Sequence, residues 1–268
     1  MIGRNRNMIN KGETEMENRR ATLQPVEEDR CLIHFDGELL TTHNNELFPP
    51  IAKDLAEILA DDLNFVYSIG EADYKYSLVY CVLSTLIHTP PKPTCGDPNC
   101  KLNPDSHTID IANMLVWDRC FRMAPDPHFG IIQRVANFAI YEFLEGNLFD
   151  LPVNHCYSIE EIRASEACPY FENAVRKFSE LADGFTRAQR FAVILVSNSW
   201  RDFSISMTLL LIAKLVTPAD YFKAVLVFRY EEFRERLTKA QKEESLRFTQ
   251  KMEYLLKALD SKGIEQLI

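Results

Sequence analysis

The chain has 268 residues, of which 46% are hydrophobic, enough to bury the core of one large domain or two smaller ones. Only 9 glycines are present, which argues against a turn-rich β-sandwich or β-barrel. The formal net charge is −9, whereas a domain that holds DNA or RNA through phosphate contacts carries a basic excess. Composition therefore favours a globular protein that does not bind nucleic acid directly.

Cysteine usage and the N-terminus bear on the compartment. The seven cysteines are an odd number, and residues 1–20 lack the apolar core of a secretory signal peptide. Disulfides are therefore not expected, and the sequence predicts a location in the nucleus or cytoplasm. The longest apolar stretch, Ile205–Val216, is interrupted by Lys214 and is too short to span a bilayer, so no membrane partner is expected.

Two segments are predicted in the first half of the chain. Residues 1–29 are charged with almost no apolar periodicity, which predicts a flexible polar tail. Residues 30–150 are predicted to form a helical N-terminal region, with a Cys/His/Pro loop at 90–107 that follows a run of prolines. Apolar residues at helical spacing predict helices over Ile51–Leu63, Tyr74–Ile87, Thr108–Met123 and Phe129–Leu144.

Residues 151–268 are predicted to form a second helical domain. Thr217 and Pro218 have the form of a helix start. Both ends of Phe191–Ile212 are apolar on most sides, so this stretch is expected in the middle of a layered domain, covered on both sides. Further helices are expected over Phe171–Leu181, Phe185–Leu215, Tyr221–Phe228 and Leu237–Leu259.

One loop carries a candidate zinc site. Cys95 and Cys100 are separated by four residues, His107 follows after six more, and Cys120 lies further along. Two thiolates and an imidazole in a loop could supply three ligands of a tetrahedral zinc site, with Cys120 as the fourth. The first spacing is at the edge of the usual range, and no CxxC pair is present. A surface loop with two ordinary reduced cysteines therefore stays open as the alternative.

Signals for catalysis are weak. The chain contains no GxSxG, GxxxxGK[ST], GxGxxG or HExxH motif. Cys156 follows His155 directly, but adjacent side chains do not by themselves form a base–nucleophile pair. We therefore expect a protein that binds a partner or ligand and is not an enzyme.

Three stretches carry a resemblance to a known family. Phe191–Phe203 reads FAVILVSNSWRDF, an apolar run followed by a small polar triplet, Trp, a polar residue, an acid and an apolar residue. Ala219–Phe228 reads ADYFKAVLVF and precedes the long amphipathic stretch Arg236–Leu259. Together these resemble the ligand-binding domain of nuclear receptors, and Ala174–Phe185 looks like the end of that family's third helix. The resemblance implies an all-α, layered helical domain, similar to a truncated receptor ligand-binding domain without a DNA-binding domain.

The resemblance also implies a function and its residues. Such a protein would regulate transcription through protein or lipophilic-ligand binding, without direct DNA contact. Arg176 and Lys177 match the position where the family clamps the C-terminal carbonyls of an amphipathic coregulator helix. A lipophilic ligand would contact apolar residues that would serve equally well as plain core: Phe178, Phe191, Ile194, Leu195 and Trp200.

An unrelated intracellular helical adaptor or scaffold is the alternative. In that case the loop from Cys95 to Cys120 would be a zinc-stapled element, and the partners would be other proteins. The two interpretations predict different arrangements of the helices around Trp200. The receptor resemblance predicts three layers, and the adaptor predicts another arrangement such as a bundle or solenoid.

Overall fold

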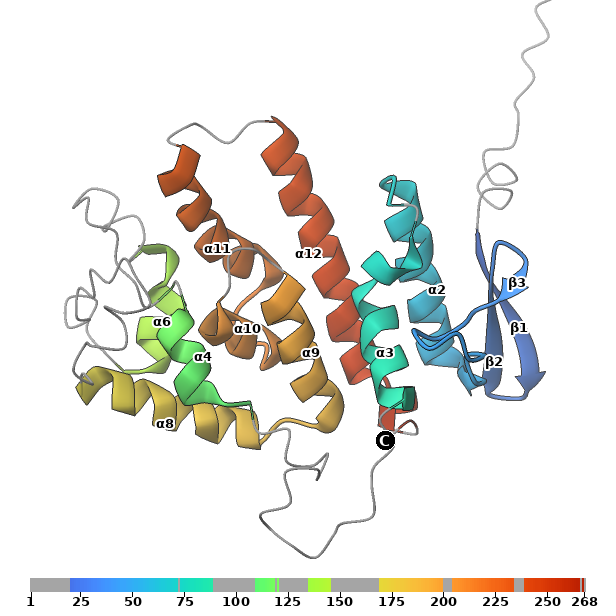
Figure 1. Ribbon diagram of the computed structural model, residues 1–268, viewed down its shortest axis with the longest axis horizontal. Coiled ribbons are helices and arrows are strands. Elements are labelled where there is room, and N and C mark those ends of the chain that lie inside the picture. Colours follow the sequence, from blue (N-terminus) through green and yellow to red (C-terminus); the bar gives the residue numbers. More distant parts are fainter. Residues whose placement is uncertain are drawn as a thin grey trace, which may run out of the picture.

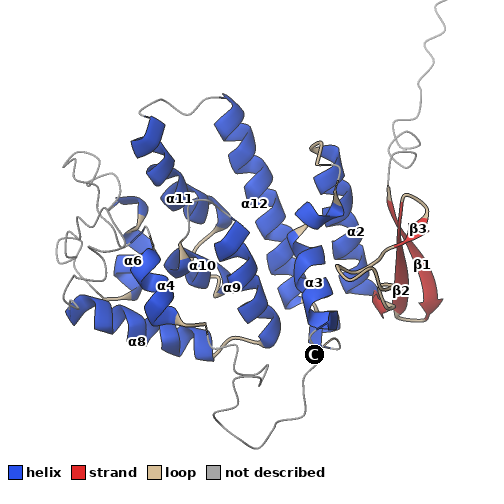
Figure 2. Cartoon of the chain, in the orientation of Figure 1, coloured by secondary structure: helices blue, strands red, loops and turns tan. Residues whose placement is uncertain are grey.

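The computed structural model describes residues 20–71, 73–88, 109–118, 120, 135–145, 169–199, 204–233, 239–265 and 267. It combines a four-stranded antiparallel sheet with helices, and Figure 2 shows the strands together at one end of the molecule. The prediction of an all-α fold is therefore wrong. The first strand is built from residues 21–27, which the sequence suggested to be part of a polar tail.

The sheet is built around its second strand, which pairs with the other three, and it has one recognisable turn. Its strands are β1 (Ala21–Glu27), β2 (Arg30–Phe35), β3 (Glu38–Leu39) and β4 (Ile51–Ala52). Asp36 and Gly37 join β2 to β3 with φ angles of 55° and 84°, the conformation of a two-residue hairpin turn that Asp-Gly favours. Cys31 and Ile33 alternate onto the buried face of β2. Only β1 lies within the segment predicted as a polar tail, and most of its residues face solvent.

Helices make up the rest of the described chain. They are α2 (Lys53–Ser68), α3 (Leu78–His88), α4 (Ile111–Trp117), α6 (Phe138–Phe143), α8 (Pro169–Asp183), α9 (Arg187–Ser199), α10 (Ile205–Ile212), α11 (Pro218–Phe233), α12 (Lys239–Asp260) and α13 (Lys262–Glu265), with a 3-10 turn at Tyr74–Tyr76. Figure 1 shows the sheet on α2, with α3 and α12 next, then α9 to α11, and α4, α6 and α8 at the far end. No helix in the described part of the chain is long and apolar enough to cross a membrane.

Helix α10 lies at the centre of the helical layers. All residues of Ile205–Ile212 are buried, and the helix contacts α4, α6, α8, α9 and α11. A helix covered on every side can be apolar all round. Its Thr208 hydroxyl is satisfied within the helix, because it donates to the carbonyl oxygen of Ser204 at 2.7 Å. The central position predicted for Phe191–Ile212 is thus confirmed for Ile205–Ile212.

The outer edge of β1 is protected against pairing. Asn64 of α2 accepts a hydrogen bond from the Ala21 amide at 2.9 Å and donates one to the Ala21 carbonyl at 3.2 Å, as a neighbouring strand would. In an antiparallel strand every second residue faces the same edge, so Pro25 shares the edge with Ala21. Proline has no N–H to offer there. The edge therefore presents few groups for addition of another strand.

A buried carboxylate joins α2 to the start of α3, and we call this group the Asp62 corner (Asp62, Ser77, Val79 and Tyr80). Asp62 Oδ2 accepts a hydrogen bond from Ser77 Oγ at 2.6 Å and from the Val79 amide at 3.4 Å, and the Tyr80 amide donates to Ser77 Oγ at 2.9 Å. Asp62 Oδ1 is buried and has no hydrogen-bond partner in the described part of the chain. Burial raises the pKa of Asp62 to about 6.

Candidate binding pocket

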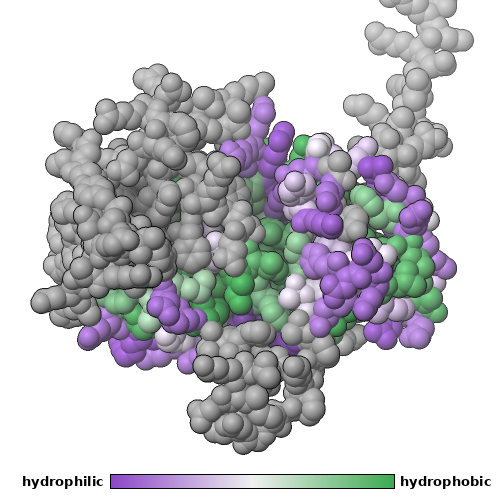
Figure 3. Space-filling model, in the orientation of Figure 1, coloured by the Kyte–Doolittle hydropathy of each residue, from purple (hydrophilic) through white to green (hydrophobic). Residues whose placement is uncertain are grey.

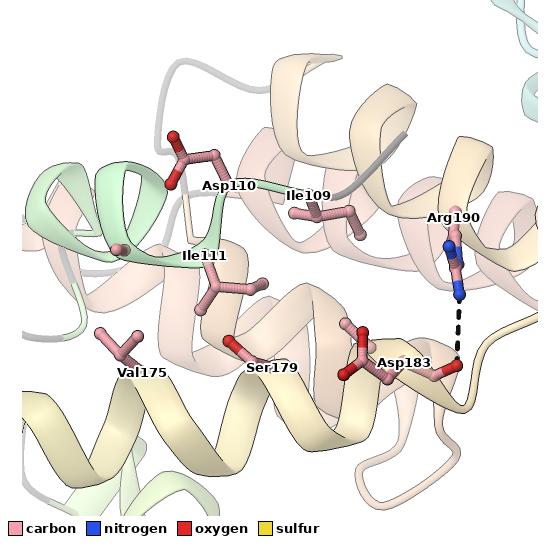
Figure 4. A pocket seen from close by; sticks show the side chains of 9 residues that line it. Ile109, Asp110, Ile111, Val175, Ser179, Asp183 and Arg190 are labelled. Carbon is pink, nitrogen blue, oxygen red and sulfur yellow. Dashed lines mark hydrogen bonds between the residues drawn. The ribbon is translucent and has the colours of Figure 1, made fainter. Parts of the chain in front are cut away.

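A pocket of about 370 Å³ lies between α4, α8 and α9 (Figure 4). Its floor is one face of α8, where Val175, Ser179 and Asp183 follow at intervals of four residues. Ile109 and Ile111, at the start of α4, lie across from this face in Figure 4. The pocket is thus apolar along one side and polar toward the C-terminal end of α8, and its volume is in the range of ligand pockets.

The α4 wall is fixed at its start by a helix cap. Asp110 is the N-cap of α4, and its carboxylate accepts hydrogen bonds from the Asn113 amide at 3.1 Å and from Asn113 Nδ2 at 2.5 Å. Figure 4 shows this carboxylate turned away from Arg190. Asp110 therefore holds the helix in shape, and its charge does not point into the polar end of the pocket.

Arg190 and Asp183 form the polar end of the pocket. Arg190 Nε donates to the Phe185 carbonyl oxygen at 3.2 Å, and Arg190 Nη2 donates to the Asp183 carbonyl oxygen at 3.2 Å. These bonds satisfy carbonyl groups at the turn after α8 that have no partner within the helix. The Asp183 carboxylate is exposed and makes no ion pair with any residue that the structure describes. Arg190 therefore closes the turn, whereas the Asp183 carboxylate is open to a partner.

A second buried carboxylate fixes the other end of α4, and we call this group the Asp118 corner (Asp118, Cys120, Ser204 and Ser206). Asp118 Oδ1 accepts from the Cys120 amide at 2.8 Å, and Oδ2 accepts from the Ser206 amide at 2.7 Å. Ser204, the N-cap of α10, accepts from the Met207 amide at 3.3 Å and donates to Cys120 Sγ at 3.0 Å. Burial raises the pKa of Asp118, and the hydrogen bonds from Ser206 and Cys120 oppose this rise. The corner anchors the α4 wall to the central helix.

Comparisons with known proteins define the fold only. The sequence matches no family model, and a comparison with curated proteins finds no match. The structure is similar to the Atu1473 protein from Agrobacterium tumefaciens, described as a candidate chaperone, with a TM-score of 0.53 and 15% identity over 91% of this chain and 84% of that chain. The D202K mutant of Atp12p from P. denitrificans gives a TM-score of 0.46 at 10% identity, over 91% of this chain and 97% of that chain.

The resemblance to nuclear receptors is wrong. The sheet on α2 and the similarity to Atu1473 overturn it, and with it the predicted role as a receptor-like regulator of transcription. The physical reason is that any helix covered on all sides needs an apolar run such as the one in Phe191–Phe203. That pattern reports burial within helical layers, and it does not identify one family. The alternative of an adaptor or scaffold fits the fold better.

The residues proposed to contact a lipophilic ligand are distributed between core and partly exposed positions. Phe178 and Phe191 are buried, and the Phe178 ring packs against Phe143 with ring centres 5.0 Å apart. Ile194 and Leu195 on α9 are half-buried, and Figure 3 shows apolar residues on the surface in the middle of this face, where α9 and α12 lie in Figure 1. Trp200 lies outside the described residues. None of the four described residues lines the pocket, so a ligand role for the set stays a prediction.

The two basic residues proposed to clamp a coregulator make contacts within the chain. Arg176 is exposed and pairs with Glu180 at 2.8 Å, one turn further along α8. Lys177 Nζ donates to the Phe143 carbonyl oxygen at 3.3 Å and lies 3.2 Å from Glu145, so it satisfies the end of α6. The contact of Arg176 lies within α8, whereas Lys177 ties α8 to the end of α6, and binding of a partner by either residue remains a prediction.

The zinc prediction falls mostly outside the described residues. Cys95, Cys100 and His107 are not among them, and the described residues contain no group of three or more His, Cys, Asp or Glu side chains that could hold a metal ion. Cys120 is buried in the Asp118 corner, where burial and the neighbouring carboxyl group raise the pKa of its thiol well above the usual value. That environment favours the protonated thiol, whereas zinc binds the thiolate. The four-ligand site stays a prediction.

Sequence inspection did not find the pocket residues, although two signals were present. Asp110 precedes an apolar helical stretch, which is the pattern of an N-cap. Asp183 stands at the end of α8 just before Gly184, where an acid opposes the helix dipole. Neither signal shows that α4 and α8 face each other, because their arrangement depends on packing around α10.

Proposed function

We propose that this protein binds another protein and acts as a chaperone or assembly factor. The observation that carries the proposal is the fold shared with the Atu1473 protein, a candidate chaperone, over 91% of the chain. Because one fold can serve many functions, a binding site on the chain is needed as well. The pocket between α4, α8 and α9 supplies one, with an apolar side and an open carboxylate at Asp183.

Binding without catalysis is part of the proposal. The Asp118 corner at the end of α4 contains a carboxylate and a thiol, and the side chains of Asp118 and Cys120 are both almost completely buried. The Asp118 carboxylate accepts from the Cys120 and Ser206 amides, and Cys120 Sγ accepts from Ser204 Oγ. A substrate could not reach them without unfolding this part of the core. A cytoplasmic or nuclear place of action also stays part of the proposal, and fractionation of cells tests it.

The experiment that tests the proposal places a photo-crosslinking amino acid at Ser179, in the pocket floor, and at Asp61, an exposed position on α2. Each protein crosslinked at Ser179 in cells of the source organism is then co-expressed with and without the full chain. We expect a protein that crosslinks at Ser179 and not at Asp61, and whose soluble yield rises in the presence of the chain. If the chain raises the soluble yield of no crosslinked protein, the proposal is wrong.

A further inference from the structure

The Asp183 carboxylate lies where it does not help α8. It is the last residue of the helix, and a negative charge at that end interacts unfavourably with the helix dipole. It is exposed and forms no ion pair with any described residue. The basic group nearest in the pocket, Arg190, bonds to the carbonyl oxygens of Phe185 and Asp183. Stability of the helix therefore does not account for an acid at this position.

The groups around this carboxylate define a site for a long side chain. Ile109, Ile111 and Val175 give the pocket apolar walls, and Asp183 and Ser179 supply acceptor oxygens toward one end. An aliphatic stem that ends in a cation combines both needs, because its methylene groups cover apolar surface while the charge stays at the polar rim. A net charge of −9 also steers a basic partner toward the chain.

We propose that the pocket receives a lysine or arginine side chain of the partner protein, with its stem on Ile109 and Ile111 and its cation on the Asp183 carboxylate. This inference rests on the proposed function, because it names the part of the partner that the same pocket holds. An aliphatic side chain without charge would use the apolar walls only. An acidic side chain would use Arg190 and would be repelled by Asp183.

The test titrates the full chain with three capped five-residue peptides, in which glycine and serine surround a central lysine, norleucine or glutamate. Methyl NMR signals of Ile109, Ile111 and Val175 report binding at the pocket. We expect these signals to shift with the lysine peptide, with a Kd about three- to fivefold lower than for the norleucine peptide, since a partly exposed ion pair contributes about that much. Equal Kd values, tighter binding of the glutamate peptide, or no shift at millimolar concentration would overturn the proposal.

Asp183→Asn supplies the matched variant, and Asp61→Asn is its control at an exposed helical position outside the pocket. We expect Asp183→Asn to abolish the preference for lysine over norleucine without lowering Tm, because the variant removes an unfavourable charge from a helix end. A merely structural role would lower Tm and leave the preference unchanged. If the peptide test fails while the chain still raises the soluble yield of the crosslinked partner, only this inference is wrong. If the chain raises the soluble yield of no crosslinked protein, the proposed function is wrong.

Discussion

Two buried carboxylates, Asp62 and Asp118, bind the starts of helices in this molecule. They differ in how far along the chain their partners lie and in how many of their oxygens accept hydrogen bonds. Asp62 caps α3 from the preceding helix, and its Oδ1 has no partner in the described part of the chain. Asp118 accepts a hydrogen bond from the backbone amide of Ser206 at the start of α10, 88 residues further along the chain. Its other carboxylate oxygen accepts a hydrogen bond from the Cys120 amide. The first corner joins neighbouring elements, and the second joins distant ones.

The difference shows what each corner contributes. The Asp62 corner lies beside the sheet-covered helix α2, away from the pocket, whereas the Asp118 corner anchors the α4 wall of the pocket to the central helix (Figure 1). Loss of either corner should lower stability. Only loss of the Asp118 corner should also disturb the pocket. Variants at each corner therefore test this difference.

The largest effect is expected for Asp118→Ala. It leaves the Cys120 and Ser206 amides buried without an acceptor, and each such group costs about 1–3 kcal/mol. We expect the free energy of unfolding in urea to fall by about 3 kcal/mol or more, and the methyl signals of Ile109 and Ile111 to shift. A loss below about 1 kcal/mol, or unchanged pocket signals, would show that this corner does not anchor α4.

Asp62→Asn should change how stability depends on pH. Because the folded-state pKa of about 6 exceeds the usual value of 3.8, the folded protein binds the proton more tightly than the unfolded chain between these pH values. Stability from this group is therefore greatest below pH 4 and falls as the pH rises through 6, by about 3 kcal/mol. The variant should remove that fall relative to the parent, as measured by urea unfolding from pH 4 to 7. If the free energies of unfolding of parent and variant change with pH in parallel, the assigned role of Asp62 is wrong.

Ser204→Ala should have a smaller effect. The variant removes the N-cap of α10 and the hydroxyl donor to Cys120, but both Asp118 bonds to backbone amides remain. We expect a loss of about 1 kcal/mol, typical of an N-cap, in thermal or urea unfolding. A loss as large as that of Asp118→Ala would mean that the serine, and not the carboxylate, holds the corner together.

The smallest effect is expected for Lys251→Gln. Lys251 pairs with Glu71 near the Asp62 corner, and its charge lowers the pKa of Asp62. Because Glu71 is partly exposed, we expect less than about 1 kcal/mol at pH 7. The variant should also shift the pH at which the Asp62 contribution is lost to a higher value. A shift to lower pH in the same unfolding series would be inconsistent with the assigned charge interaction.

The sequence predicted the helices better than the sheet or the pocket. Apolar spacing is a local signal, so the stripes at Ile51–Leu63 and Tyr221–Phe228 coincide with parts of α2 and α11. The Asp36-Gly37 turn is also a local signal, but the strands on either side of it are short, with only Glu38–Leu39 after the turn. The pairing of Asp118 with Ser206 joins groups far apart in the chain, and the pocket wall depends on it. Such contacts arise from packing, and no local pattern encodes them.

The most direct test of the central claim, that this chain binds a protein partner through the α4–α8–α9 pocket, is the soluble yield of the protein that crosslinks at Ser179. It would be measured with no chain, with the parent chain, with Asp183→Asn and with the Asp61→Asn control. We predict a high yield with the parent and with Asp61→Asn, and a lower yield with Asp183→Asn. A yield that is the same with and without the parent chain would contradict the claim.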